Sequence, residues 1–139
     1  MLTPDQLQMV AALLAADSDM VAAYLFGSFA KGTESAASDL DVAVLLGAGV
    51  DRTEHSDRAI QLSLVLSKRL GREVDLVILN AAPPFLKFQI FRYGTPILER
   101  DVVAARRFVA AAIIEYFDFE PLKRRMEQAV IDRVKERAR

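Results

Sequence analysis

The sequence predicts an α/β protein, a sandwich in which helices pack against a small mixed β-sheet. Short runs of aliphatic and β-branched residues alternate along the chain with longer segments in which apolar residues recur every three or four positions. Apolar residues make up 53% of the 139 residues, with only six glycines and five prolines, which is typical of a folded domain with a sizeable core. A chain of this length is expected to form one domain, residues 1–139.

The first half of the chain is expected to hold a helix, two strands and a second helix. Thr3-Pro4-Asp5-Gln6 predicts the first helix start, because threonine caps it, proline fits the first turn and glutamine stands three residues after the cap. The elements expected here are a helix to about Asp17, strands at 20–26 and 40–46, a short helical turn after Ser28 that Gly32 ends, and a helix from about Asp51 to Leu70 that Gly71 closes.

The second half is expected to add a third strand, a short helix and an edge strand. The run 74–79, Val-Asp-Leu-Val-Ile-Leu, predicts a buried strand because it is short, apolar and rich in β-branched residues. Pro83-Pro84 opens a helix that ends at Gly94, and Ile97-Leu98 predicts the edge strand. Three phenylalanines at helical spacing in this segment are expected in the core, with base stacking as the alternative for one of them; they are Phe85, Phe88 and Phe91.

A helical tail is expected from about Asp101 to the end of the chain, after a core at about 20–100. Pro121 divides the tail, and because proline removes a helical hydrogen bond and clashes with the preceding turn, we expect two helices or one kinked helix. Each part carries an apolar stripe: Val102, Val109, Ile113 and Tyr116 in the first, and Leu122, Met126, Val130 and Val134 in the second.

One motif in the first half carries chemistry: Gly27-Ser28, ten residues of turn-forming chain, and then Asp39-Leu40-Asp41. Residues two apart on a strand share one face, about 6.5–7 Å apart, so the two carboxylates raise each other's pKa unless a cation lies between them. Mg²⁺ prefers a few carboxylates together with substrate phosphates. A glycine turn offers backbone N–H groups to a phosphate, and Ser28 adds a hydroxyl. The motif therefore predicts nucleotidyl or phosphoryl transfer; the alternative is that Asp39 is a turn residue and Asp41 an exposed strand residue.

A third carboxylate, Asp75, interrupts the apolar run at 74–79. A charge in a buried strand is costly unless it is paired or binds a metal, so Asp75 is a third candidate for the same site. The alternative interpretation is an aspartate at the strand entrance that caps a turn after Gly71-Arg72-Glu73.

The Gly-Ser and Asp-x-Asp spacing resembles the signature of the nucleotidyltransferase superfamily typified by DNA polymerase beta. That superfamily places a third metal-binding aspartate on a strand like that of Asp75. Larger members append an acceptor-binding domain, whereas here some forty helical residues follow the core, so the chain resembles a minimal nucleotidyltransferase over nearly its whole length. Many such proteins are antitoxins paired with a HEPN-domain ribonuclease toxin, and the resemblance implies a heteromeric complex in which a toxin tyrosine is adenylylated with ATP.

The resemblance implies a role for each residue of the motif. Asp39 and Asp41 would hold two Mg²⁺ ions about 3.5–4 Å apart, and Asp75 would complete the acceptor-side metal and take the proton of the attacking hydroxyl. Gly27 and Ser28 would hold the β- and γ-phosphates of ATP. Lys31 would neutralise a phosphate, with ordinary turn chemistry beside Gly32 as its alternative.

Composition limits the other functions. The chain has no cysteine, which excludes disulfides and thiolate metal sites and fits a reducing, cytoplasmic location. No segment reaches the ~18 uncharged residues of a membrane span. Residues 1–99 hold 8 basic and 12 acidic residues, and residues 100–139 hold 10 basic and 7 acidic, so neither part is a nucleic-acid-binding arm. The single histidine, His55, stands in a polar segment and is expected to be solvated.

Two further functions stay open on the sequence. One is a non-catalytic antitoxin that neutralises its toxin by covering it, and the other is an adenylyltransferase of a small molecule whose acceptor pocket comes from homodimerisation. The basic run Lys123-Arg124-Arg125 is either a solvated face or a contact with phosphate or partner.

Overall fold

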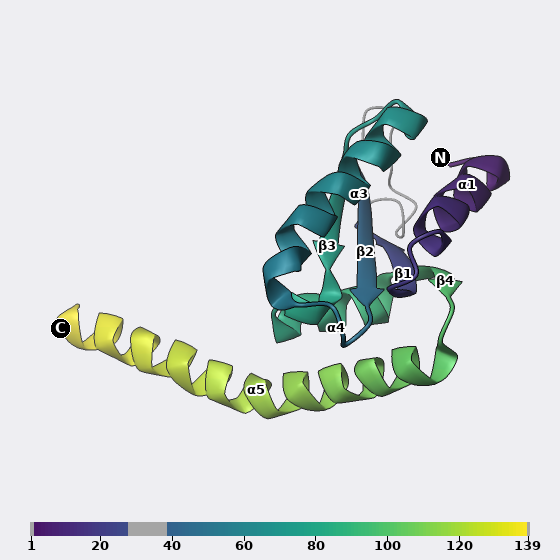
Figure 1. The fold of residues 1–139 in the computed structure, drawn as a ribbon. Helices are drawn as coiled ribbons and strands as arrows, with labels where there is room; N and C mark the ends of the chain where they lie inside the picture. The colour runs from purple at the N-terminus through teal and green to yellow at the C-terminus, as the bar shows by residue number, and fades with distance from the viewer. Residues whose placement is uncertain (1, 28–38, 139) are drawn as a thin grey trace.

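The computed structural model describes residues 2–27 and 39–138, which form a four-stranded mixed sheet with packed helices (Figure 1). The strands are β1 (Met20–Phe26), β2 (Leu40–Leu46), β3 (Val74–Ile78) and β4 (Thr95–Glu99), in the spatial order β3-β2-β1-β4. β1 pairs antiparallel with β2 and β4, whereas β2 and β3 run parallel. The predicted α/β class and mixed sheet are therefore confirmed.

The helices divide between the two faces of the sheet. They are α1 (Pro4–Ala15), α3 (His55–Leu70), α4 (Pro84–Tyr93) and α5 (Val102–Arg137), with two 3₁₀ turns, η1 (Arg52–Glu54) and η2 (Leu79–Ala81). Successive residues of β2 point to opposite faces. Val42 and Val44 pack with Leu14 of α1 and Leu66 of α3, whereas Ala43 and Leu45 pack with residues of α4 and α5.

The ends of α1 and α3 follow the predicted local chemistry. The Thr3 hydroxyl accepts the backbone N–H of Gln6, and the Gln6 side chain accepts the N–H of Thr3, which is a complete capping box. Gly71 ends α3 in the left-handed region at φ 66°, where a side chain would be strained. None of the helices in the described residues is both long enough and apolar enough to cross a membrane.

Three expectations about individual residues are wrong. His55 is buried instead of solvated, because η1 turns the start of α3 inward against the end of β3. Phe85 is about half exposed, since α4 covers the sheet with Ile90 and leaves its first turn at the surface. The run from Val74 is an edge strand, with an exposed Asp75, and it ends one residue early at Ile78.

The tail forms one helix. α5 continues unbroken through Pro121 and curves gently along its length (Figure 1). Its first half packs on the sheet and on α4, with Ala105 and Ala112 buried, and its second half extends beyond the rest of the molecule. The tail is thus one helix, as in the second alternative of the prediction, but it curves gently and has no sharp kink at Pro121.

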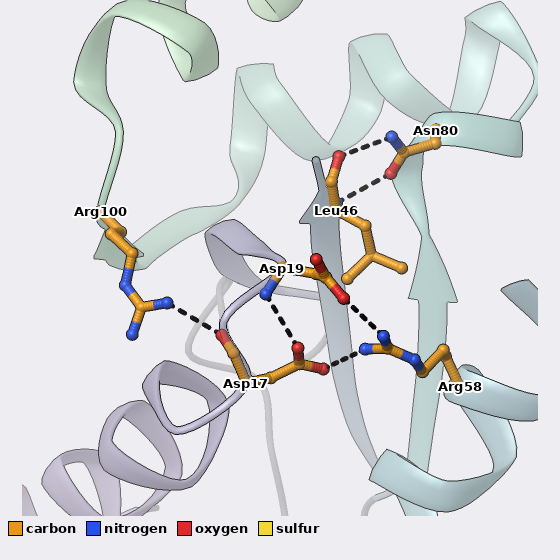
Figure 2. A network of polar contacts seen from close by, with 6 residues as sticks. All are labelled: Asp17, Asp19, Leu46, Arg58, Asn80 and Arg100. Atoms are coloured by element: carbon orange, nitrogen blue, oxygen red, sulfur yellow. Dashed lines mark hydrogen bonds and ion pairs between the residues drawn. The ribbon is translucent and has the colours of Figure 1, made fainter. Parts of the chain in front are cut away.

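A polar network fixes the turn between α1 and β1 against α3 (Figure 2). The guanidinium of Arg58 donates to Asp17 and to Asp19, with nitrogen–oxygen distances of 2.5 Å in both pairs. These two carboxylates raise the pKa of Arg58 above its usual value. Arg100 of the β4–α5 connection donates to the carbonyl of Asp17, so the network also ties β4 to this turn.

Arg58→Ala is expected to lower the free energy of unfolding by about 1–3 kcal/mol, because it leaves two aspartates side by side without their cation. Urea denaturation of the full chain measures this change. Arg69→Ala, on the same helix and exposed, is the matched control and should stay within about 0.5 kcal/mol of the wild type. Equal stability of both variants would contradict the structural role of the network.

Candidate functional site

Two of the predicted carboxylates lie side by side at one edge of the sheet. Asp41 of β2 pairs in register with Asp75 of β3, and on its other side it pairs with Phe26 of β1. Neighbouring strands lie about 4.8 Å apart, so side chains at one register position are close neighbours. The structure thus brings together residues that are 34 positions apart in the sequence.

Both carboxylates project from the same face of the sheet. Successive residues of β2 point to opposite faces of the sheet, so Asp41 points to the same face as Ala43 and Leu45. This is the face that α4 and α5 cover. Asp75 pairs directly with Asp41 and follows it on this face. Asp75 is exposed and Asp41 half-buried, so the pair stands at the rim of the core, open to a substrate.

Asp39 stands two residues before Asp41, immediately ahead of β2, and is exposed. Burial raises the pKa of the Asp41 carboxyl above its usual value, and the negative charges of Asp75 and Asp39 raise it further, in that order. The three carboxylates are therefore close enough for the charges of Asp75 and Asp39 to affect the pKa of Asp41. Among the described residues, none donates a hydrogen bond to the Asp41 carboxylate or forms an ion pair with it, so none offsets this repulsion.

Gly27 closes the site at the end of β1. Its φ of 70° lies in the left-handed region, and a Cβ added there would meet the Oδ2 atom of Asp41. A glycine is therefore required both by the backbone conformation and by the space that the Asp41 carboxylate occupies. The sequence predicted that Gly27 forms a turn that binds phosphate. That Gly27 also lies against Asp41 could not be predicted, because it depends on the register between β1 and β2.

Two predicted site residues, Ser28 and Lys31, lie outside the described residues. Among the described residues, no three carboxylate or imidazole groups are placed to hold one metal ion. The donor set itself fits a hard divalent cation: the neighbouring carboxylates are oxygen ligands, and their mutual repulsion falls when a cation binds between them.

The chain matches a known enzyme family and proteins of known name. The family described as polymerase beta, nucleotidyltransferase matches residues 8–102. The protein adenylyltransferase MntA of Shewanella oneidensis is 37% identical over 71 residues, 51% of this chain and 48% of that protein. A candidate protein adenylyltransferase of Methanocaldococcus jannaschii is 32% identical over 76 residues, 55% of this chain and 77% of that protein. The chain thus spans about half the length of the Shewanella relative in this alignment.

Solved structures resemble the chain over nearly all of its length. A toxin–antitoxin structure with AMP-PNP has a TM-score of 0.71 at 26% identity, covering 96% of this chain and 99% of that one. A complex of a tri-AMPylated Shewanella oneidensis HEPN toxin with its MNT antitoxin has a TM-score of 0.68 at 25% identity, with 94% and 96% covered. With the family match over more than half of its residues and the carboxylate pair in register at the sheet edge, the chain belongs to the polymerase beta nucleotidyltransferase family.

Proposed function

We propose that this chain transfers AMP from ATP to a tyrosine of a cognate HEPN-domain toxin and thereby acts as its antitoxin. The observation that carries the proposal is the pairing of Asp41 with Asp75 at an open sheet edge, next to a glycine at which an added Cβ would meet the Asp41 carboxylate. Family membership supports nucleotidyl transfer, and the similar complexes support a HEPN protein as the acceptor.

The proposed roles follow from the charges of the site. Asp39, Asp41 and Asp75 would hold Mg²⁺, which supplies positive charge to the triphosphate and to the transition state. Gly27 leaves room for the Asp41 carboxylate and, with Ser28, would place backbone and hydroxyl donors toward the phosphates. Lys31 is proposed as a further phosphate contact.

The acceptor chemistry requires a base. A tyrosine hydroxyl has a pKa near 10, so it is protonated at neutral pH and a poor nucleophile. In the proposed reaction the phenol oxygen attacks the α-phosphorus of ATP, the bond to the pyrophosphate leaving group breaks, and the phenol proton passes to Asp75. The exposure of Asp75 leaves it accessible to a side chain presented by another protein.

Co-expression with the proposed cognate HEPN-domain toxin tests the proposal. The wild-type chain is expected to relieve growth arrest and to leave AMP groups on a toxin tyrosine, detected by intact-mass and peptide mass spectrometry. Asp39→Ala should abolish both. A toxin that stays unmodified and is still neutralised by the Asp39→Ala chain would contradict catalysis and favour the covering mechanism.

A small-molecule acceptor is the second reading that the sequence left open, and the same experiment addresses it. An unmodified, unneutralised HEPN protein, together with ATP-dependent pyrophosphate release in a small-molecule extract, would contradict a protein acceptor.

A further inference from the structure

The second half of α5 presents an apolar face that nothing in the described chain covers. From Pro121 to Ala138 every residue except Lys123 is exposed, and this segment extends beyond the sheet and the other helices (Figure 1). At 1.5 Å per residue it is about 26 Å long. An exposed apolar stripe of this length on a helix marks an interaction surface. We call it the overhang stripe, and it comprises Leu122, Met126, Val130 and Val134.

The overhang stripe continues the face with which α5 packs on α4, where Tyr116 stacks on Phe88 and Lys123 lies over the ring of Phe85. Residues three, four or seven apart fall on one side of a helix. Such steps lead from the buried Ala112 through the half-buried Tyr116 and Lys123 to Met126 and then to the rest of the stripe. The helix therefore keeps its apolar pattern beyond the end of α4, which indicates that another apolar surface takes the place of α4 there.

The charged residues beside the overhang stripe indicate the charge of the partner surface that would cover it. Arg133 and Arg137 stand three residues after Val130 and Val134, so both flank the stripe. Neither arginine has an ion pair or hydrogen bond to a described side chain. Residues 122–138 hold six basic residues and three acidic ones. Two copies that paired through this face would bring like charges together, whereas an acidic partner would neutralise them.

We propose that the overhang stripe docks the HEPN partner, through an apolar helix of that partner flanked by acidic residues. The inference rests on the proposed function and adds the surface on which the partner binds. Asp41 and Asp75 belong to the face of the sheet that α4 and α5 cover. The helix that carries the overhang stripe therefore packs on the same face of the sheet as the one to which the two carboxylates belong.

Binding of the purified chain to the proposed cognate HEPN-domain toxin tests the proposal. Val130→Glu is expected to weaken the complex about 30-fold or more, because it places a charge in the apolar contact. Ile114→Glu is the matched control: Ile114 is 62% exposed against 61% for Val130, lies on the same helix and faces away from the stripe. It should bind within about twofold of the wild type. Met126→Glu is a second stripe variant, and thermal unfolding checks that each variant is folded.

Charge reversal tests the acidic character of the partner. Arg133→Glu together with Arg137→Glu should weaken binding about tenfold or more at low salt, and less at high salt. Arg124→Glu with Lys135→Glu makes the same change of net charge at exposed positions that are not three, four or seven residues from any stripe residue, and should bind nearly as the wild type.

Each outcome decides between the two proposals. Binding that Val130→Glu and Met126→Glu leave unchanged would overturn the docking surface, while AMP transfer to the HEPN protein would still stand. A wild-type chain that neither binds nor modifies the HEPN protein would overturn the proposed function itself. A wild-type dimer in light scattering that Val130→Glu dissociates would show that a second copy occupies the stripe and would also overturn the inference.

Discussion

Asp41→Asn is expected to reduce AMP transfer by on the order of 10³-fold, the largest effect of any single substitution in this chain. Loss of metal-borne charge stabilisation typically removes several kcal/mol from the transition state, and each 1.36 kcal/mol is tenfold in rate. The effect is expected to be largest at Asp41 because it lies between Asp75 and Gly27. The charges of both Asp75 and Asp39 also raise its pKa. Pyrophosphate release with the HEPN partner present measures the change.

The same variant should change stability in the opposite direction. Because the pKa of Asp41 is raised in the folded state, the contribution of Asp41 to folding stability is fully present below its unfolded-state pKa and is lost as pH rises through its folded-state pKa. Asp41→Asn removes this dependence, so it should be more stable than the wild type at pH 7 without Mg²⁺. Asp57→Asn, at an exposed position on α3, is the isosteric control and should keep both activity and the wild-type pH profile. Full activity of Asp41→Asn would mean that the site is misplaced.

Gly27→Ala is expected to have the second largest effect, a loss of about 10²-fold in AMP transfer with a loss of stability of about 1–3 kcal/mol. Its Cβ would displace the Asp41 carboxylate, and misplacement by about 1 Å is sufficient for a rate loss of this size. The stability loss comes from the left-handed backbone at φ 70°. Transfer assays and urea denaturation on one preparation measure the two effects separately.

Gly71→Ala separates strain from the contact with Asp41. Gly71 has nearly the same φ, 66°, but a Cβ added there meets nothing within 4 Å. We therefore expect Gly71→Ala to lose a similar amount of stability from strain and to keep its transfer rate. A transfer rate that falls equally in both variants would contradict the specific fit of Gly27 against Asp41.

Local signals in the sequence predicted most of the fold. The cap at Thr3, the glycine at position 71 and the apolar runs place α1, α3 and the strands within a few residues of their observed bounds, because these signals act between near neighbours. The burial of His55 depends instead on the contact between the start of α3 and the end of β3, which are more than twenty positions apart. Its two ring nitrogens have no hydrogen-bond partner among the described residues, a feature that no local pattern indicates.

The candidate site was predicted only in part, because local signals predict some of its contacts and the pairing of distant strands sets the others. The spacing of Asp39 and Asp41 on one strand is local and places them on one face. That Asp75 lies in register with Asp41 follows only from the parallel pairing of β2 and β3, and that Gly27 touches Asp41 follows only from the hairpin of β1 and β2. That α5 continues through Pro121 likewise depends on the whole helix, since a proline by itself favours a break.

The most direct test of the central claim is the intact mass of the purified HEPN partner after incubation with this chain and ATP. With Mg²⁺ present, the account predicts a mass increase of one or more whole AMP groups, which fragmentation places on a tyrosine. Removal of Mg²⁺ with a chelator, or replacement of the chain by Asp41→Asn, should leave the partner unmodified. A partner that gains no AMP from the wild-type chain, or gains it equally from Asp41→Asn, would contradict the account.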